Sequence, residues 1–274
     1  MNRHAPLVTT VLAVIAVVAL GNAGCSSSKK TAAPSSAPPS SSAAAFATPS
    51  VSGTVVVFAA SSLKATFTTL ATNFEHATGV KVVPSYGGSD TLAAQITQGA
   101  PVDVFAAAST TTMGTVTTAG DGVGTPQVFA KNELEIAVSP SNPDHIASLA
   151  DVTKSGVKLA VCAATVPCGT AATKAFAAAK LTPHPVTLEQ DVASVLTKVE
   201  LGEVDAGIVY QTDVKSAGSK VLGVNFAEAA NAINTYPIVA VKTGKNPTAA
   251  QAFVNYVGSP AGQQILQTAG FERP

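Results

Sequence analysis

Charged residues are scarce in this sequence, and neither sign dominates. They make up 12% of the 274 residues, with 16 Lys and Arg against 16 Asp and Glu. When Arg3, Lys29 and Lys30 are set aside, residues 53–274 hold 13 basic and 16 acidic residues, a net charge of −3. No run of basic residues occurs. We therefore do not expect nucleic acid as a partner.

Long apolar runs are also scarce. The uncharged run LVTTVLAVIAVVAL at 7–20 follows a short basic start, and no second segment of spanning character follows it. The run is too short to favour a spanning helix and is typical of an export signal. Because small residues precede Cys25, we predict a lipoprotein-type signal peptide over 1–25 with lipidation of Cys25. Asn22 departs from the lipoprotein pattern, which usually has Leu at that position, and an ordinary signal is the alternative.

Residues 26–52 consist mostly of Ser, Pro and Ala and contain one aromatic residue. Such a segment cannot bury enough apolar surface to offset the entropy of ordering its backbone. We predict a disordered tether there, followed by a folded part over 53–274 that is long enough for one large domain or two lobes. The expected location is the cell envelope, on the outer face of the cytoplasmic membrane, where disulfides are permitted.

Cysteine and histidine are too few to indicate catalysis. The chain has three Cys and four His, and no His or further Cys lies near the pair Cys162 and Cys168 in the sequence. A zinc site needs four ligands, and a nucleophilic Cys168 needs a neighbouring base. The serine-hydrolase pattern G-x-S-x-G is incomplete in GGSDT, which ends in Thr91. We predict no enzyme, no metal site and no cofactor, and a Cys162–Cys168 disulfide, which the spacing permits.

The folded part alternates short β-rich runs with helical patterns. This alternation is typical of an α/β fold in which a mostly parallel sheet is flanked by helices. The expected strands are 54–60, 80–86, 102–108, 133–140, 157–162, 206–210 and 236–241. The expected helices are 63–79, 89–99, 109–119, 169–180, 191–201, 211–217, 247–257 and 260–269.

Five loops where strands end or helices begin carry small, hydroxyl or amide side chains. They are AASSL (59–63), SYGGSDTL (85–92), VPCGT (166–170), EQDVAS (189–194) and GIVYQTD (207–213). Ligands of open α/β sheets gather at such ends, and helix N-termini offer unpaired N–H groups to anions. Each loop alone is usually only a cap or a turn. Together they could form an anion site without Lys or Arg.

Six motifs in order resemble the periplasmic molybdate-binding proteins, the solute receptors of molybdate ABC transporters. The motifs are VFAASSLKATF, YGGSDTLAAQI, GAPVDVFAAAS, LAVCAATVPCGTAA, EQDVASVLTKVELGEVDAGIVYQTDV and YPIVAV…AQAFVNYVGSPAGQQIL…GF, between about Thr54 and Phe271. The resemblance implies a two-lobed (type II) periplasmic-binding-protein fold with a double crossover hinge. Lobe one is expected over 53–133 plus 238–274, and lobe two over 134–237.

The same resemblance implies which residues bind the oxyanion. Ser62 and Ser89 would donate from lobe one, with Ser61 as the alternative to Ser62 if the register shifts by one. Lobe two would contribute the main-chain N–H groups of Cys168 and Val192 and the hydroxyl of Tyr210. Asp90 departs from the family pattern, and we expect its carboxylate to point away from the anion.

The resemblance implies capture of molybdate and tungstate between the lobes and delivery to an ABC importer. Sulfate or another small oxyanion is the alternative cargo. An exported hydrolase and a structural lipoprotein are weaker alternatives. The expected partners are the transporter permease, its ATPase and, through the lipid anchor, the membrane. We expect a monomer in which the disulfide fixes the turn that presents the Cys168 N–H.

Overall fold

The computed structural model describes residues 51–274. The predicted signal peptide (1–25), the predicted lipidation site Cys25 and residues 26–50 of the predicted tether lie outside the described residues. In the described part of the chain, no helix has both the length and the apolar character needed to cross a membrane.

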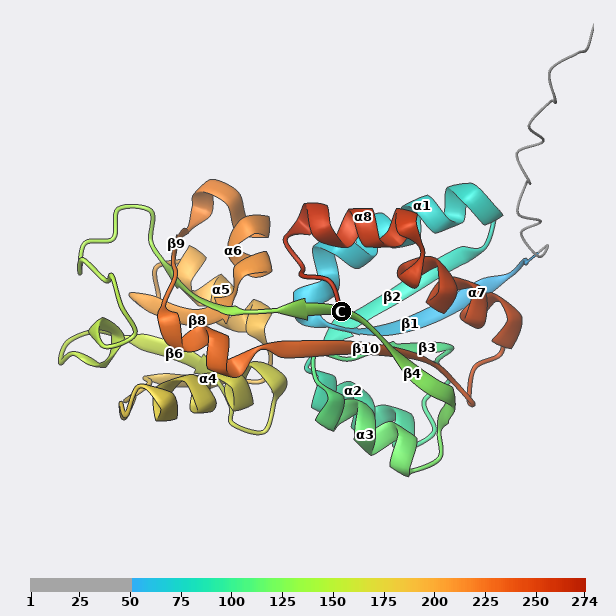
Figure 1. Cartoon of the computed structure of the whole chain (residues 1–274), viewed down its shortest axis with the longest axis horizontal. Helices are drawn as coiled ribbons and strands as arrows, with labels where there is room; N and C mark the ends of the chain where they lie inside the picture. Colours follow the sequence, from blue (N-terminus) through green and yellow to red (C-terminus); the bar gives the residue numbers. More distant parts are fainter. Residues whose placement is uncertain (1–50) are drawn as a thin grey trace, which may run out of the picture. The chain divides into compact units, whose positions relative to one another are not determined.

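One five-stranded sheet has the strand order β2-β1-β3-β10-β4. Strand β1 is parallel to β2 and β3, whereas β10 is antiparallel to β3 and β4. We call this sheet and its helices the first lobe; α1, α7 and α8 cover one face and α2 and α3 the other (Figure 1). Its elements are β1 (Thr54–Ala60), η1 (Ser61–Leu63), α1 (Lys64–Thr78), β2 (Lys81–Gly87), α2 (Ser89–Thr97), β3 (Val104–Ala106), α3 (Thr110–Thr118), β4 (Gly122–Asn132), β10 (Asn234–Val241), α7 (Pro247–Gly258) and α8 (Pro260–Ala269).

A second five-stranded sheet has the order β7-β6-β8-β5-β9. Strand β6 is parallel to β7 and β8, and β5 is antiparallel to β8 and β9. With its helices this sheet forms the second lobe (Figure 1). Its elements are β5 (Leu134–Val138), η2 (Asp151–Thr153), β6 (Leu159–Cys162), α4 (Pro167–Ala178), β7 (Thr187–Glu189), α5 (Val192–Glu200), β8 (Ala206–Tyr210), α6 (Gln211–Ala217), η3 (Gly218–Lys220), β9 (Leu222–Val224) and η4 (Ala227–Ala232).

The chain crosses between the lobes twice, from β4 into β5 and from η4 back into β10. In each sheet, the single antiparallel strand is the one that enters from the other lobe. At the crossing, Asn132 and Asn234 pair across β4 and β10. The predicted lobe boundary between 237 and 238 falls inside β10, which begins at Asn234. The predicted fold class, two mostly parallel sheets flanked by helices with a double crossover, is confirmed.

Helix α1 is fixed by an aromatic cluster under the first sheet. Its apolar residues recur three and four positions apart, so Phe67 and Phe74 share one buried face. Both rings pack on Phe253 of α7, with centroid distances of 6.1 and 5.3 Å. This packing fixes the start of α1 and therefore the position of Ser62 just before it.

Three strands were not predicted from the sequence. Strand β4 contains Gly122, Gly124 and Pro126, residues that weaken a strand pattern. It lies at a sheet edge and has a register shift beside Pro126, which is where a strand tolerates proline. Strands β7 and β9 are three-residue edge strands, too short to show a period.

Candidate functional site

A small cavity lies between the two lobes where several helices begin. All five predicted ligand residues line it, and so does the alternative, Ser61. The full set is Ala60, Ser61, Ser62, Gly87, Gly88, Ser89, Ala108, Val166, Pro167, Cys168, Asp191, Val192 and Tyr210. The fold therefore brings together segments that are far apart in the sequence and belong to different lobes.

Each predicted ligand residue stands at the start of a helix. Ser62 lies in η1, directly before α1, and Ser89 is the first residue of α2. Cys168 and Val192 are the second and first residues of α4 and α5, and Tyr210 is the N-cap of α6. The first N–H groups of a helix have no intrahelical partner and carry the positive end of its dipole. Several such ends aimed at one cavity form an anion site from neutral groups.

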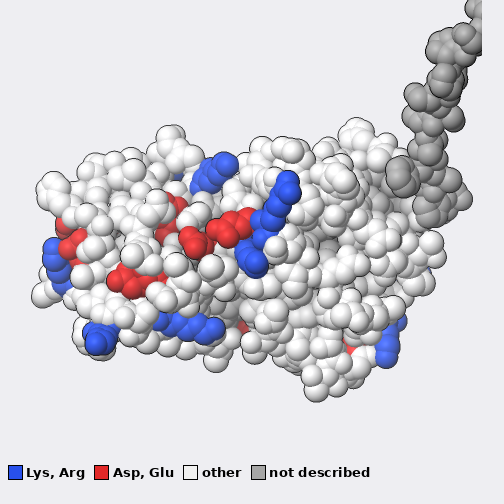
Figure 2. Space-filling view, viewed as in Figure 1, with Lys and Arg blue, Asp and Glu red and all other residues white. Residues whose placement is uncertain are grey.

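The cavity contains no Lys or Arg, and Asp191 is its single charged residue. The Asp191 carboxylate caps α5: it accepts hydrogen bonds from the Ser194 N–H at 3.0 Å and the Ser194 hydroxyl at 3.1 Å. Its oxygens are thus turned to their own helix. The face of the molecule shown in Figure 2 is also mostly uncharged. An anion in the cavity would be held by hydrogen bonds and helix dipoles.

Two of the three predicted hydroxyl donors, Ser89 of the first lobe and Tyr210 of the second, are almost fully buried. The Ser89 oxygen accepts a hydrogen bond from the Ala108 N–H at 3.0 Å, which leaves the Ser89 proton free to donate. The Tyr210 hydroxyl lies near Tyr236 and Asn234 but makes no hydrogen bond of good geometry with a protein group in the described structure. A buried hydroxyl without a partner is costly, so a ligand that accepts its hydrogen bond would relieve this cost.

Tyr210 keeps its proton at any physiological pH. Burial raises the pKa of its phenol well above 10, and the nearby Tyr236 and Asp213 raise it further. The group is therefore available as a hydrogen-bond donor.

The turn before α4 is tied down covalently. Cys162 and Cys168 form a disulfide with their Cα atoms 5.7 Å apart, as predicted. The next residue, Gly169, packs so closely on the Ala163 carbonyl group that a Cβ atom would collide with it. Both features fix the backbone that carries the Cys168 N–H.

Asp90 is not among the residues that line the cavity. Its side chain is half-buried, and its Oδ1 atom is buried without a hydrogen-bond partner. That oxygen lies 2.8 Å from the position that a Cβ atom of Gly88 would occupy. The carboxylate thus packs beside the cavity wall.

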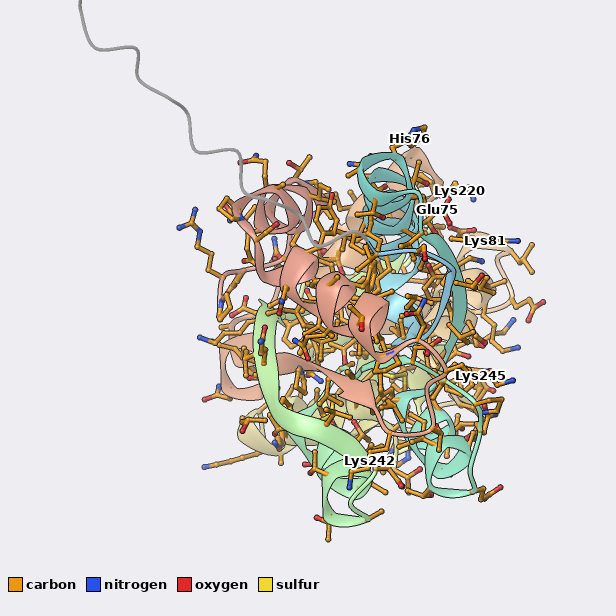
Figure 3. All side chains as sticks on the ribbon, turned by 90° about the vertical axis from the view of Figure 1, so that its right-hand side faces the viewer. Glu75, His76, Lys81, Lys220, Lys242 and Lys245 are labelled. Atoms are coloured by element: carbon orange, nitrogen blue, oxygen red, sulfur yellow. A yellow bond between two sulfur atoms is a disulfide. The ribbon has the colours of Figure 1, made fainter. Side chains whose placement is uncertain are left out.

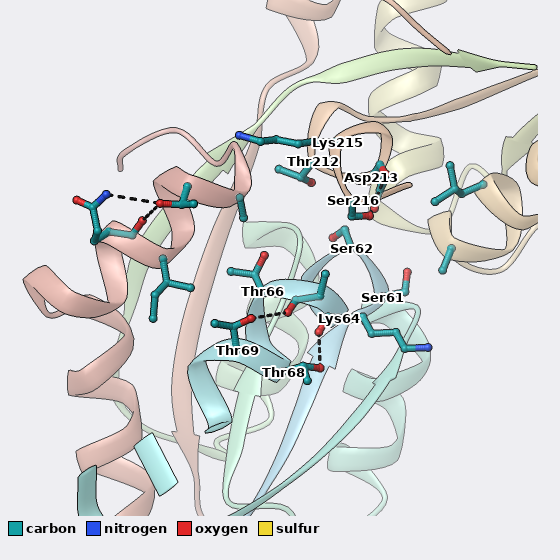
Figure 4. Close-up of a pocket in the computed structure, with 17 residues that line it drawn as sticks. Ser61, Ser62, Lys64, Thr66, Thr68, Thr69, Thr212, Asp213, Lys215 and Ser216 are labelled. Atoms are coloured by element: carbon teal, nitrogen blue, oxygen red, sulfur yellow. Dashed lines mark hydrogen bonds between the residues drawn. The ribbon is translucent and has the colours of Figure 1, made fainter. Parts of the chain in front are cut away.

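A larger groove of about 720 Å³ adjoins the cavity and shares Ser61 and Ser62 with it. Its walls come from α1, α5, α6 and α8, and Figure 4 shows Ser62 opposite Thr212 and Asp213. The groove is much larger than a tetrahedral oxyanion. The smaller cavity, with its converging helix ends, is the better candidate for the site.

The three histidines of the folded part do not line the cavity. His76 lies in the last turn of α1, at an outer end of the first lobe (Figure 3), and His145 and His184 lie in loops. In residues 51–274, no group of three or more His, Cys, Asp or Glu residues could hold a metal ion.

The cavity and the crossed two-lobe fold define a class of proteins that hold a small solute between lobes. The chain belongs to the bacterial extracellular solute-binding protein family, whose model matches residues 55–272. This membership confirms the prediction of a solute-binding protein rather than an enzyme.

The chain is similar to three proteins that bind oxyanions or belong to a transporter, according to their names. The molybdate-binding protein ModA of Mycobacterium tuberculosis (strain H37Rv) is 42% identical over 221 residues, which are 80% of this chain and 85% of that protein. The substrate-binding domain of a putative molybdenum ABC transporter from Clostridium difficile has 29% identity and a TM-score of 0.61, and the match covers 81% of this chain and 99% of that one. The sulfate-binding protein SubI of M. tuberculosis H37Rv shares the fold at 17% identity, with a TM-score of 0.71 and coverage of 81% and 87%.

Proposed function

We propose that this protein captures molybdate or tungstate between its lobes and delivers it to an ABC importer. The observation that carries the proposal is the cavity itself, in which helix N-termini and hydroxyl groups of both lobes converge without a cationic side chain. The proposed ligand contacts are the hydroxyls of Ser62, Ser89 and Tyr210 and the N–H groups of Cys168 and Val192. The similarity to molybdate-binding ModA supports the choice of cargo.

The donor set suits an anion without protons. Molybdate and tungstate are fully ionised at neutral pH, so each of their oxygens accepts hydrogen bonds and none donates. A hydrogen phosphate ion would set its own O–H against a protein donor, at a cost of about 1–3 kcal/mol. Hydrogen bonds to an ionised partner contribute about 1.5–3 kcal/mol each, so five or more offset the desolvation of the dianion.

Sulfate is the alternative cargo, because it is also free of protons at neutral pH. The sulfate-binding protein SubI shares this fold, and for this reason sulfate is the oxyanion that we name as the alternative. Discrimination between sulfate and the larger molybdate rests on the size of the cavity when the lobes are closed.

The proposed transport cycle needs no chemistry on the ligand. Binding across both lobes shifts the protein towards its closed form, which docks on the permease that an ATPase drives. Similarity to the binding domain of a putative molybdenum ABC transporter supports these partners. In this proposal, acylated Cys25 holds the protein at the outer face of the cytoplasmic membrane.

Native mass spectrometry of residues 26–274 tests the choice of cargo. The protein is incubated with equal concentrations of molybdate, tungstate, sulfate and phosphate. The expected spectrum shows one molybdate or tungstate per chain. A spectrum dominated by sulfate adducts would favour the alternative, and a spectrum without adducts would contradict both.

A further inference from the structure

A chain of buried polar groups leads from the crossing between the lobes to the anion cavity. The Asn132 Nδ2 atom lies 2.8 Å from Thr212 Oγ1 and 3.4 Å from the Tyr236 hydroxyl. The Tyr236 hydroxyl in turn lies 3.0 Å from Ser62 Oγ. All four residues are buried, and the most exposed of them, Ser62, is only 8% exposed. Solvent therefore does not compete for these hydrogen bonds.

Chemistry fixes the direction of the hydrogen bonds that Asn132 makes in this chain. Asn132 Oδ1 accepts a hydrogen bond from the Glu133 N–H at 3.1 Å, which identifies this atom as the amide oxygen. The amide nitrogen can only donate, and its two N–H groups donate hydrogen bonds to Thr212 and Tyr236. The Tyr236 oxygen accepts one of these hydrogen bonds, and its own O–H remains to donate. The hydrogen bond between Tyr236 and Ser62 can run in either direction. When Tyr236 is the donor, the Ser62 O–H stays available to a ligand.

Tyr236 retains its phenol proton throughout the physiological range. Burial raises the pKa of its phenol above 10; the hydrogen bond with Ser62 opposes this shift less strongly, and the charge of Asp213 raises the pKa further. The Tyr210 ring packs edge-on against Tyr236 at a centroid distance of 6.2 Å. Tyr236 therefore lies beside both hydroxyl residues, Ser62 and Tyr210, that face the cavity from opposite lobes.

The positions of these residues tie the site to the crossing. Asn132 ends β4 and Tyr236 lies near the start of β10, the two first-lobe strands at which the chain crosses between the lobes. Thr212 belongs to α6 of the second lobe, two residues after Tyr210. Figure 4 shows Thr212 opposite Ser62. The chain of hydrogen bonds thus links a donor loop of one lobe to the ligand helix of the other.

We propose that Asn132 and Tyr236 are positioning residues that hold the Ser62 hydroxyl as a donor toward the bound anion. This inference rests on the proposed function. The two residues make the site favour proton-free oxyanions, because Tyr236 occupies a lone pair of the Ser62 oxygen and so favours Ser62 as a donor to the ligand. Without Tyr236, the Ser62 hydroxyl could rotate freely and accept a hydrogen bond from the O–H of hydrogen phosphate.

A double-mutant cycle tests the relay. Molybdate affinity is measured by calorimetry for wild type, Tyr236→Phe, Ser62→Ala and the double variant. We expect Tyr236→Phe to weaken binding about three- to tenfold in the wild-type background and less than about twofold in the Ser62→Ala background. Equal losses in both backgrounds would overturn the relay. Tyr256→Phe, which removes a phenol of α7 that does not line the cavity, is the matched control and should leave affinity unchanged.

A second variant reverses the direction of the bonds. In Asn132→Asp, the introduced carboxylate accepts a hydrogen bond from the Tyr236 hydroxyl. Tyr236 then has no O–H left for Ser62, so Ser62 becomes the donor to Tyr236 and turns its oxygen to the cavity. The new charge also repels the anion, but that part of the loss persists in the Ser62→Ala background. We expect Asn132→Asp to lower molybdate affinity at least about threefold more in the wild-type background than in the Ser62→Ala background. We also expect it to reduce the preference for molybdate over phosphate. Equal losses, with preference unchanged, would overturn the proposal.

Three outcomes are distinguishable. If wild-type protein binds none of the oxyanions, both the proposed function and the role of the relay fail. If wild type binds and the losses are additive, only the relay fails. If wild type binds and the loss from Tyr236→Phe nearly disappears in the Ser62→Ala background, both are supported. Because buried substitutions can unfold a protein, each variant is accepted only when its circular dichroism spectrum is native. The cycle of Tyr236→Phe and Ser62→Ala tests the relay even if Asn132→Asp does not fold.

Discussion

Gly88 of the first lobe touches the main-chain carbonyl group of Gln190 of the second. A Cβ atom at position 88 would collide with the Gln190 carbonyl oxygen and would lie 2.8 Å from Asp90 Oδ1. Both glycine and carbonyl stand beside the anion cavity, directly before Ser89 and Asp191. The lobes can approach this closely here because position 88 has no side chain.

Substitution of Gly88 by Ala should therefore hinder closure. The added methyl group must push the Gln190 backbone away, which separates donors of the two lobes. We expect molybdate affinity to fall at least about tenfold, since lost alignment weakens several hydrogen bonds together. Calorimetry measures the effect.

Gly114→Ala is the matched control for this substitution. A Cβ atom there meets nothing within 4 Å, and the residue lies inside α3. It should leave affinity unchanged and raise the free energy of unfolding by about 0.5–1 kcal/mol. Equal effects of the two substitutions on binding would contradict a role for Gly88 in closure.

Tyr210→Phe should separate binding from stability. The hydroxyl makes no hydrogen bond within the described structure, so its removal should not lower the stability of the ligand-free protein. Molybdate affinity should fall by about 1–3 kcal/mol, because a donor to the anion is lost. Calorimetry and urea unfolding of the same variant measure both quantities. Unchanged affinity would remove Tyr210 from the site.

Reduction of the Cys162–Cys168 disulfide should affect both stability and binding. Opening a loop of about seven residues lowers the free energy of unfolding by about 2 kcal/mol in the chain-entropy model. The Cys168 N–H then belongs to a looser turn, and more ordering remains for the ligand to impose. We expect weaker molybdate binding with reductant. The variant in which both cysteines are Ser should bind equally with and without reductant; undiminished affinity in reduced wild type would leave the disulfide a stability role only.

Asp213 should make stability depend on pH near neutrality. Burial raises the pKa of its carboxyl to about 7, opposed by the hydrogen bond from the Tyr210 N–H at 3.0 Å and aided by the charge of Asp191. Because the folded pKa lies above the unfolded one, the stabilising contribution is complete below about pH 4 and is lost as pH rises through 7. From pH 5.5 to 8.5 the loss is about 2 kcal/mol.

Asp213→Asn keeps an acceptor for the Tyr210 N–H and removes this titration. Urea unfolding at several pH values should show a flatter pH dependence for the variant than for wild type, by about that amount. Parallel curves for the two proteins would show that Asp213 does not titrate in this range.

Local rules were sufficient to predict part of the fold: alternating strands and helices predicted the α/β class, and small or hydroxyl residues at helix starts were compatible with an anion site. The two-lobed arrangement and the grouping of the five ligand residues were predicted from the resemblance to the molybdate-binding family. The cavity brings together Ser62, Ser89, Cys168, Val192 and Tyr210, whose ligand roles stay predictions.

The parts that the sequence did not predict depend on packing between distant segments. Tyr236 and Ser62 are 174 positions apart, and nothing local marks Tyr236 as more than the start of a buried strand. The need for Gly88 follows from a carbonyl group in the other lobe. Edge strand β4 was missed since its Gly and Pro residues are tolerated only where one side of the strand is unpaired.

The most direct test of the central claim is calorimetry of residues 26–274 with molybdate, tungstate, sulfate and phosphate at neutral pH. The donor-only cavity predicts tight binding of one molybdate or tungstate per chain. Phosphate should bind at least roughly a hundredfold more weakly because it carries a proton, and sulfate likewise because it is smaller than the closed cavity. Preference for sulfate or phosphate, or no oxyanion binding at all, would contradict it.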